Sequence, residues 1–227
     1  MGSPINQTLL EQGLNFLGRE TARQTHEITN VHNIINELSG LLGDMLAAAA
    51  GGRELEPERV GKIVTKIQEQ IQRGNNLVRG LNRFAHSVDV LAGMFDLEEV
   101  AERVEFLAER HARLGKVRLR CLPPPKNVSF DGFLLGYQQL ILDALDLILE
   151  SDGRSNEVCI GYQVADGVME FIVESDQPRV KNDRTVKGIK QIEALIAELG
   201  GRLSVPGEAG VLQRVVLSFP HLQAGGG

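Results

Sequence analysis

The chain has 227 residues, of which 42% are hydrophobic and 24% are charged, and its formal net charge is −6. This composition is typical of one or two globular domains, and the interspersed acidic and basic residues argue against nucleic acid as the main partner. No apolar run approaches the roughly 18 residues of a membrane span, and no secretory leader is visible. We therefore expect a cytoplasmic protein with no membrane partner.

The two cysteines, Cys121 and Cys159, each lie in a segment typical of a strand. They show neither CxxC spacing nor a neighbouring histidine cluster. The sequence thus predicts reduced, structural thiols and no metal site.

A first long helix is predicted to start at Ser3-Pro4 and to end at the glycine pair 51–52. It has about 45 residues and a length of about 70 Å. Apolar residues recur in it at steps of three and four, which predicts a seam for packing against other helices. The seam residues are Ile28, Val31, Ile35, Leu38, Leu42 and Met45. A second helix with an apolar stripe opens at Pro57 and is expected to continue to about residue 93.

Two long helices joined by a short loop predict an antiparallel helical hairpin. A lone hairpin cannot cover both of its apolar stripes, so we expect two copies to form a dimeric four-helix bundle. The alternative is a hairpin that its own C-terminal domain covers.

The remainder of the chain alternates helical and strand patterns. Its segments are a helix capped by Asp96 and ended at Gly115, a strand "KVRLRCL", an apolar helix "FDGFLLGYQQLILDALDLILES", a hairpin "EVCIGYQVADGVMEFIVES" turning at Asp166-Gly167, a helix "TVKGIKQIEALIAELGG", and strands "RLSVPG" and "VLQRVVLSFP". This order predicts an α+β fold in which helices cover one face of a sheet. The expected divisions are a hairpin domain over 1–94, a sandwich domain over 95–222 and a disordered tail over 223–227.

Three segments resemble bacterial sensor histidine kinases. "THEITNVHNII" in the first helix resembles the H-box, "ELGGRLSV" resembles the end of the last kinase helix, and "VVLSFP" resembles the closing strand. The resemblance covers residues 20 to 220 approximately and implies a dimerisation hairpin followed by an ATPase-like α/β sandwich. It places His26 on the phospho-accepting position, Glu27 on the adjacent acid that orients the ring, and Asn30 on the amide used by bifunctional members.

The sandwich departs from the family where nucleotide should bind. Gln139 and Asp143 replace the two asparagines, Asp176 lies in "SDQPRV" where a glycine loop is expected, and Gly188 is the one glycine left of the second glycine box. Four residues, 181–184, stand in for the lid. Phosphates need glycine-opened backbone amides or a metal, so we expect this degenerate nucleotide site to bind no ATP and the chain to bind no cofactor.

The seam numbering puts His26 on the exposed face, with Asn30 one turn further along. We expect a histidine phosphotransferase in two-component phosphorelay signalling, resembling ATP-independent members of this class. It would move a phosphoryl group between His26 and the aspartate of a response-regulator receiver domain, which supplies its own magnesium.

Three other interpretations remain open from the sequence. In one, His26 is a solvated surface residue of a pseudokinase that docks and sequesters a response regulator or a kinase. In another, Asn30 orients a water for receiver dephosphorylation. In the third, a residual ATP-dependent kinase uses Asp143 to hold magnesium.

Overall fold

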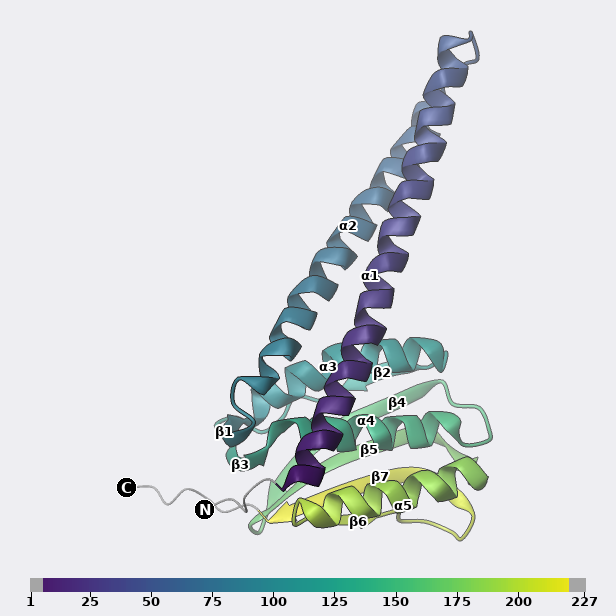
Figure 1. The fold of residues 1–227 in the computed structure, drawn as a ribbon. Coiled ribbons are helices and arrows are strands. Elements are labelled where there is room, and N and C mark those ends of the chain that lie inside the picture. The colour runs from purple at the N-terminus through teal and green to yellow at the C-terminus, as the bar shows by residue number, and fades with distance from the viewer. Residues whose placement is uncertain (1–5, 221–227) are drawn as a thin grey trace. The chain divides into compact units, whose positions relative to one another are not determined.

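The computed structural model describes residues 6–220, and Figure 1 shows their arrangement. The helices are α1 (Gln7–Ala50), α2 (Pro57–Ala85), the 3₁₀ turn η1 (His86–Val88), α3 (Leu97–Leu114), α4 (Leu134–Glu150) and α5 (Asp183–Glu198). The strands are β1 (Ala92–Asp96), β2 (Arg118–Cys121), β3 (Ser129–Phe133), β4 (Glu157–Ala165), β5 (Val168–Val180), β6 (Arg202–Ser204) and β7 (Val211–Pro220). The predicted α+β class, long helices followed by a mixed sheet with helices, is confirmed.

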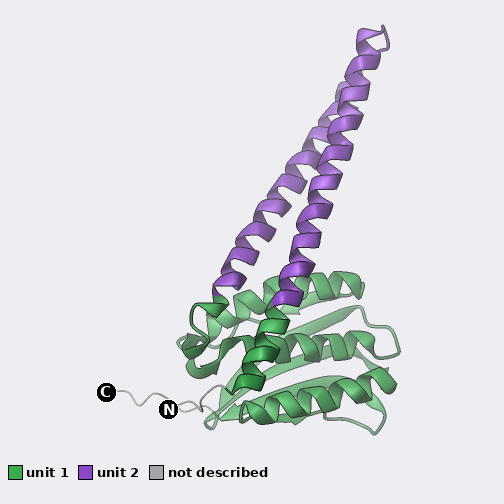
Figure 2. Ribbon diagram, in the orientation of Figure 1, with its two compact units in different colours: residues 1–17, 87–227 green, residues 18–86 purple. Residues whose placement is uncertain are grey.

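The chain divides into two compact units, coloured separately in Figure 2. Gly18–His86 forms the hairpin unit, and the start of α1 through Leu17 joins Ser87 onward in the sandwich unit. The first turns of α1 therefore belong to the core of the sandwich, where a Cβ on Gly13 would lie 2.5 Å from the Phe133 ring. The predicted domain division at residue 94 stays a prediction.

The hairpin unit packs α1 against α2 along part of the predicted seam. Val31 is fully buried, and a Cβ on Gly74 would lie only 3.2 Å from its Cγ1 atom. The apolar stripe of α2 is not fully covered within one chain, because Val64 is 38% exposed and Ile71 is 47% exposed.

The ends of the two long helices differ in part from the prediction. The predicted start at Ser3-Pro4 lies outside the described residues, and the described helix begins after Asn6, whose Oδ1 accepts a hydrogen bond from the Leu9 amide at 2.8 Å. Pro57 opens α2 as expected. The predicted end near residue 93 is wrong: α2 stops at Ala85, and the chain passes through η1 into β1.

The sandwich unit contains a five-stranded sheet of order β2-β4-β5-β7-β6, in which β2 and β4 are parallel and the other pairs are antiparallel. Helices α3, α4 and α5 cover one face of this sheet, with α4 contacting β5 and β7 (Figure 1). Alternate residues of β5, among them Phe171 and Val173, point into the core beneath α4 and are fully buried.

Local signals explain several boundaries in this unit. The Asp96 side chain accepts a hydrogen bond from the Glu98 amide and begins α3 as predicted. Asn182 and Thr185 form a capping box at the start of α5. The predicted turn at Asp166-Gly167 is confirmed, with φ of 51° and 73°, the left-handed values that a tight two-residue hairpin requires.

A second, two-stranded sheet was not predicted. Residues 129–133 form β3, paired antiparallel with β1, so the predicted helix over "FDGFLLGYQQ" begins at Leu134 instead. Strand β5 also runs on through residues 176–180 after an irregularity between Glu174 and Arg179. The predicted disordered tail, 223–227, lies outside the described residues.

Candidate functional site

His26 lies on the exposed side of α1, as the seam numbering predicts. Its Nδ1 atom is 3.2 Å from Nδ2 of Asn30, one helical turn further on. Residues four apart on a helix are neighbours on its surface, so this contact follows directly from the H-box spacing. It holds the ring at Nδ1 and leaves Nε2 on the opposite edge of the imidazole.

The direction of this hydrogen bond depends on the tautomer of the ring. With the amide nitrogen toward Nδ1, Asn30 donates and the ring proton sits on Nε2. Half a turn of the amide presents Oδ1 to an Nδ1–H group, and the Nε2 lone pair is then free for attack. The same pair of residues can therefore hold the ring in an unreactive or a nucleophilic tautomer.

Glu27 contacts the second helix of the hairpin. Its side chain is 8% exposed, and its Oε2 atom accepts a hydrogen bond from Nη2 of Arg73 on α2 at 2.8 Å. The carboxylate thus ties the two helices of the hairpin together directly beside His26. Its predicted role in orienting the imidazole stays a prediction.

The face of α1 that carries Glu27 holds two more polar side chains. Glu20 and Gln24 are each 1% exposed, and Glu20 pairs with Arg23 at 2.6 Å. Spacing of three and four residues places Glu20, Gln24 and Glu27 on one stripe of the helix. This buried stripe is therefore polar as far as Glu27, and Val31, the next residue along it, is apolar.

Gln139 and Asp143 occupy adjacent turns of α4 and contact each other, with Nε2 of Gln139 donating to Oδ2 of Asp143 at 3.4 Å. Both residues are half-buried. In this arrangement the glutamine amide turns toward the carboxylate of its own helix.

Asp176 is hydrogen-bonded to the segment that leads into β4. Its Oδ1 atom accepts from Oγ of Ser155 at 2.6 Å and from the amides of Asn156 and Glu157 at 3.1 and 3.3 Å. These donors, the Ser155 hydroxyl first, lower the pKa of Asp176. The carboxylate therefore organises a loop of its own domain.

Gly188 lies within α5 at its contact with α4. A Cβ at this position would come within 2.8 Å of Cδ1 of Leu147, so glycine allows the two helices to approach. The predicted degenerate nucleotide residues thus lie on three elements, α4, β5 and α5, and each has contacts within the sandwich.

Two polar contacts were missed in the sequence. His111 of α3, for which no partner was predicted, has its Nδ1 atom 2.5 Å from Oδ1 of Asp146 on α4. Arg179, in the segment predicted as a loop, donates to the carbonyls of Ser151 and Leu149 at the end of α4. Long-range pairing brings these groups together, and periodicity carries no signal for it.

The cysteines are free thiols in adjacent strands. Burial raises the pKa of Cys121 to about 12 and also raises that of Cys159. Among residues 6–220, no group of three or more His, Cys, Asp and Glu side chains could hold a metal ion. No helix in the same range is long and apolar enough to cross a membrane.

No protein-family model and no curated protein matches the sequence. Among solved structures, the chain is similar to the histidine kinase AdeS of Acinetobacter baumannii, with 14% identity, a TM-score of 0.45, and coverage of 81% of this chain and 94% of that one. The catalytic domain of the histidine kinase ThkA matches with 14% identity and a TM-score of 0.46, over 58% of this chain and 97% of that chain.

The cytoplasmic segment of the histidine kinase QseC matches with 16% identity and a TM-score of 0.45, over 67% of this chain and 95% of that chain. The predicted histidine-kinase-like core agrees with these matches. At such identities and scores the likeness concerns the fold alone.

Proposed function

We propose that this protein is a histidine phosphotransferase of two-component signalling, in which His26 exchanges a phosphoryl group with the aspartate of a response-regulator receiver domain. The observation that carries the proposal is the exposed imidazole, held at Nδ1 by Asn30 with Nε2 left on the opposite edge. A nucleophile presented on a rigid helix needs only a correctly docked donor to react.

In the forward step, Nε2 of His26 attacks the phosphorus atom of the receiver's aspartyl phosphate. The nitrogen–phosphorus bond forms as the phosphorus–oxygen bond to aspartate breaks, and the receiver's carboxylate leaves with that electron pair. The imidazole ring of His26 gains positive charge during the attack. Oδ1 of Asn30 stabilises this charge by accepting the hydrogen bond from Nδ1–H. The receiver's magnesium neutralises the phosphoryl oxygens, so this chain needs no nucleotide or metal of its own.

The proposal includes a homodimer built on the hairpin. The exposed apolar residues of α2, Val64 and Ile71, support it, because one chain leaves them in contact with solvent. Two hairpins packed as a four-helix bundle would cover this stripe. Sedimentation equilibrium or light scattering of the full chain measures the mass directly, and a monomer at micromolar concentration would contradict this part.

Transfer is tested by mixing the protein with a panel of phosphorylated receiver domains, and separately with labelled ATP and magnesium. We expect acid-labile, base-stable label from a receiver and none from ATP. His26→Gln should abolish the label, and His32→Gln, an exposed histidine on the same helix, should leave it intact. Label from ATP that Asp143→Ala removes would instead identify a residual kinase.

The second candidate is a docking pseudokinase in which His26 has no chemical role. It is favoured by the contacts of Asp176 with the loop before β4 and of Gly188 with α4, because these give both residues structural roles that need no nucleotide. This candidate predicts receiver binding without label and with unchanged receiver phosphate lifetime. A shortened lifetime without label on His26, lost in Asn30→Ala, would identify phosphatase action.

A further inference from the structure

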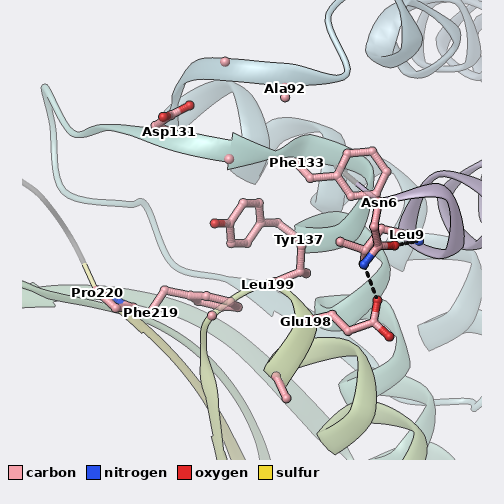
Figure 3. A pocket seen from close by; sticks show the side chains of 14 residues that line it. Asn6, Leu9, Ala92, Asp131, Phe133, Tyr137, Glu198, Leu199, Phe219 and Pro220 are labelled. Atoms are coloured by element: carbon pink, nitrogen blue, oxygen red, sulfur yellow. Dashed lines mark hydrogen bonds between the residues drawn. The ribbon is translucent and has the colours of Figure 1, made fainter. Parts of the chain in front are cut away.

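A cleft of about 650 Å³ opens in the sandwich unit. The start of α1, the β1–β3 pair, the end of α5 and the end of β7 form its walls (Figure 3). Its volume lies within the range of sites that enclose small organic molecules. None of the residues that the proposed function uses lines it.

Aromatic rings form one wall of this cleft. The Tyr137 and Phe219 rings meet edge to face with centroids 4.8 Å apart, and Phe133 continues the wall from β3 (Figure 3). The Tyr137 ring lies so close to β3 that a Cβ on Gly132 would come within 2.4 Å of it. Glycine at position 132 therefore lets the ring lie back against the strand and form a wall of the cleft.

The charged groups of the cleft are all acidic. Asp131 and Glu198 line it, and both residues are exposed. The described lining includes no lysine, arginine or histidine. Nδ2 of Asn6 donates a long hydrogen bond of 3.5 Å to Oε2 of Glu198, and this contact leaves the charge of the carboxylate in place.

The Tyr137 hydroxyl adds a neutral polar group. Among residues 6–220 it makes no hydrogen bond, and burial, followed by the nearby charge of Asp131, raises its pKa to about 12. The hydroxyl therefore stays protonated at neutral pH, and it can both donate a hydrogen bond to a ligand and accept one from it.

We propose that this cleft binds an organic cation with an aromatic body, of the arylalkylamine class. The rings of Tyr137, Phe133 and Phe219 supply apolar and edge-to-face contacts for an aromatic group. The carboxylates of Asp131 and Glu198 attract the ammonium group, and they disfavour an acid of the same shape. This site is independent of the proposed phosphotransfer at His26.

Three indole compounds that differ mainly in charge test the proposal on the full chain: tryptamine, tryptophol and indole-3-acetate. The protein contains no tryptophan, so indole emission and its anisotropy report the probe alone. We expect tryptamine to bind saturably, tryptophol to bind more weakly, and indole-3-acetate to bind weakest of the three. Added salt should weaken tryptamine binding and leave tryptophol binding unchanged.

The double variant Asp131→Asn/Glu198→Gln should weaken tryptamine binding about tenfold and leave tryptophol binding unchanged. Glu193→Gln, an exposed acid on α5 that does not line the cleft, is the matched control and should bind tryptamine like the original chain. Equal affinity for all three probes, no binding of any, or equal loss in the control variant would overturn the proposal.

Discussion

Replacing Arg73 by glutamine is expected to loosen the hairpin beside His26. The Arg73 guanidinium donates to Glu27 across the two helices at 2.8 Å, and the glutamate side chain is 8% exposed against 35% for the arginine. A hydrogen bond between charged groups stabilises a fold by about 1.5–3 kcal/mol. The partial exposure of Arg73 favours the lower half of that range, so we expect a loss of about 2 kcal/mol.

Glutamine at both positions should recover about half of that loss, because a neutral pair can still hydrogen-bond and no carboxylate stays buried. The cycle of Glu27→Gln, Arg73→Gln and the double variant then gives a coupling free energy of at least about 1 kcal/mol, because any loss in Glu27→Gln alone adds to the difference. A favourable coupling free energy distinguishes an ion pair that stabilises the hairpin from two side chains that act independently.

Hydrogen exchange measures the local free energy, because the hairpin can open without unfolding the sheet. Amide protection near Arg73 on α2 should fall about 30-fold in the single variant, while amides of β5 keep theirs. Arg79→Gln is the control, since Arg79 is exposed and bonds Asn76 on its own helix. Additive effects in the cycle, or an equal loss in the control, would refute the role assigned to this contact.

Two further predictions concern stability. Gly61→Ala should raise the free energy of unfolding by about 0.5–1 kcal/mol, because an added Cβ on this helical residue meets nothing within 4 Å. Gly201→Ala should lower the free energy of unfolding by about 2 kcal/mol, because its Cβ would lie 2.5 Å from the Phe219 ring. Urea titration tests both, and equal shifts would contradict the packing argument. The raised pKa of Cys121, about 12 against an ordinary 9.0, contributes stability that is full below pH 9 and is lost between about pH 9 and 12. Urea midpoints across that interval should fall less steeply in Cys121→Ala, and an unchanged slope would exclude this thiol as a cause.

The sequence was sufficient for the long helices, for most of the five-stranded sheet and for several caps. Pro57 opens α2, Asp96 caps α3, and the pair Asp166-Gly167 adopts the positive φ values of a tight turn. Each of these features depends on residues within a few positions of one another. Such local preferences act whatever the rest of the chain does, and they can be read without knowing the fold.

The small sheet could not be found in this way. Residues 129–133 lead directly into α4, and the apolar pattern of the helix continues back through Phe130 and Phe133 without a break. Their strand conformation depends on pairing with β1, more than thirty residues earlier, where Phe95 stands opposite Phe130. The same partnership ends α2 early, because residues 92–96 are needed as a strand. Tertiary pairing here overrides local pattern.

In the candidate site, too, local contacts could be predicted from the sequence and long-range contacts could not. The contact between His26 and Asn30 lies within one helix, so the spacing of the H-box was enough to predict that they are neighbours. The contact between Glu27 and Arg73 joins two helices, and its formation depends on the register of the hairpin. No pattern in either helix fixes that register, so the arginine could not be predicted.

The residues at the positions of histidine kinase motifs fall into two groups: packing within the fold accounts for some of them and not for others. Gly188 is needed where α5 approaches Leu147, and Asp176 is needed to hold the amides before β4, so either residue would be present without a nucleotide. Their survival is therefore no sign of ATP binding. His26 is exposed and its ring contacts Asn30 on the outer side of α1, so neither helix packing nor the hairpin core requires a histidine there. Chemistry at the ring is the role that the proposed function gives it, and His26→Gln, which leaves the packing untouched, separates that role from stability.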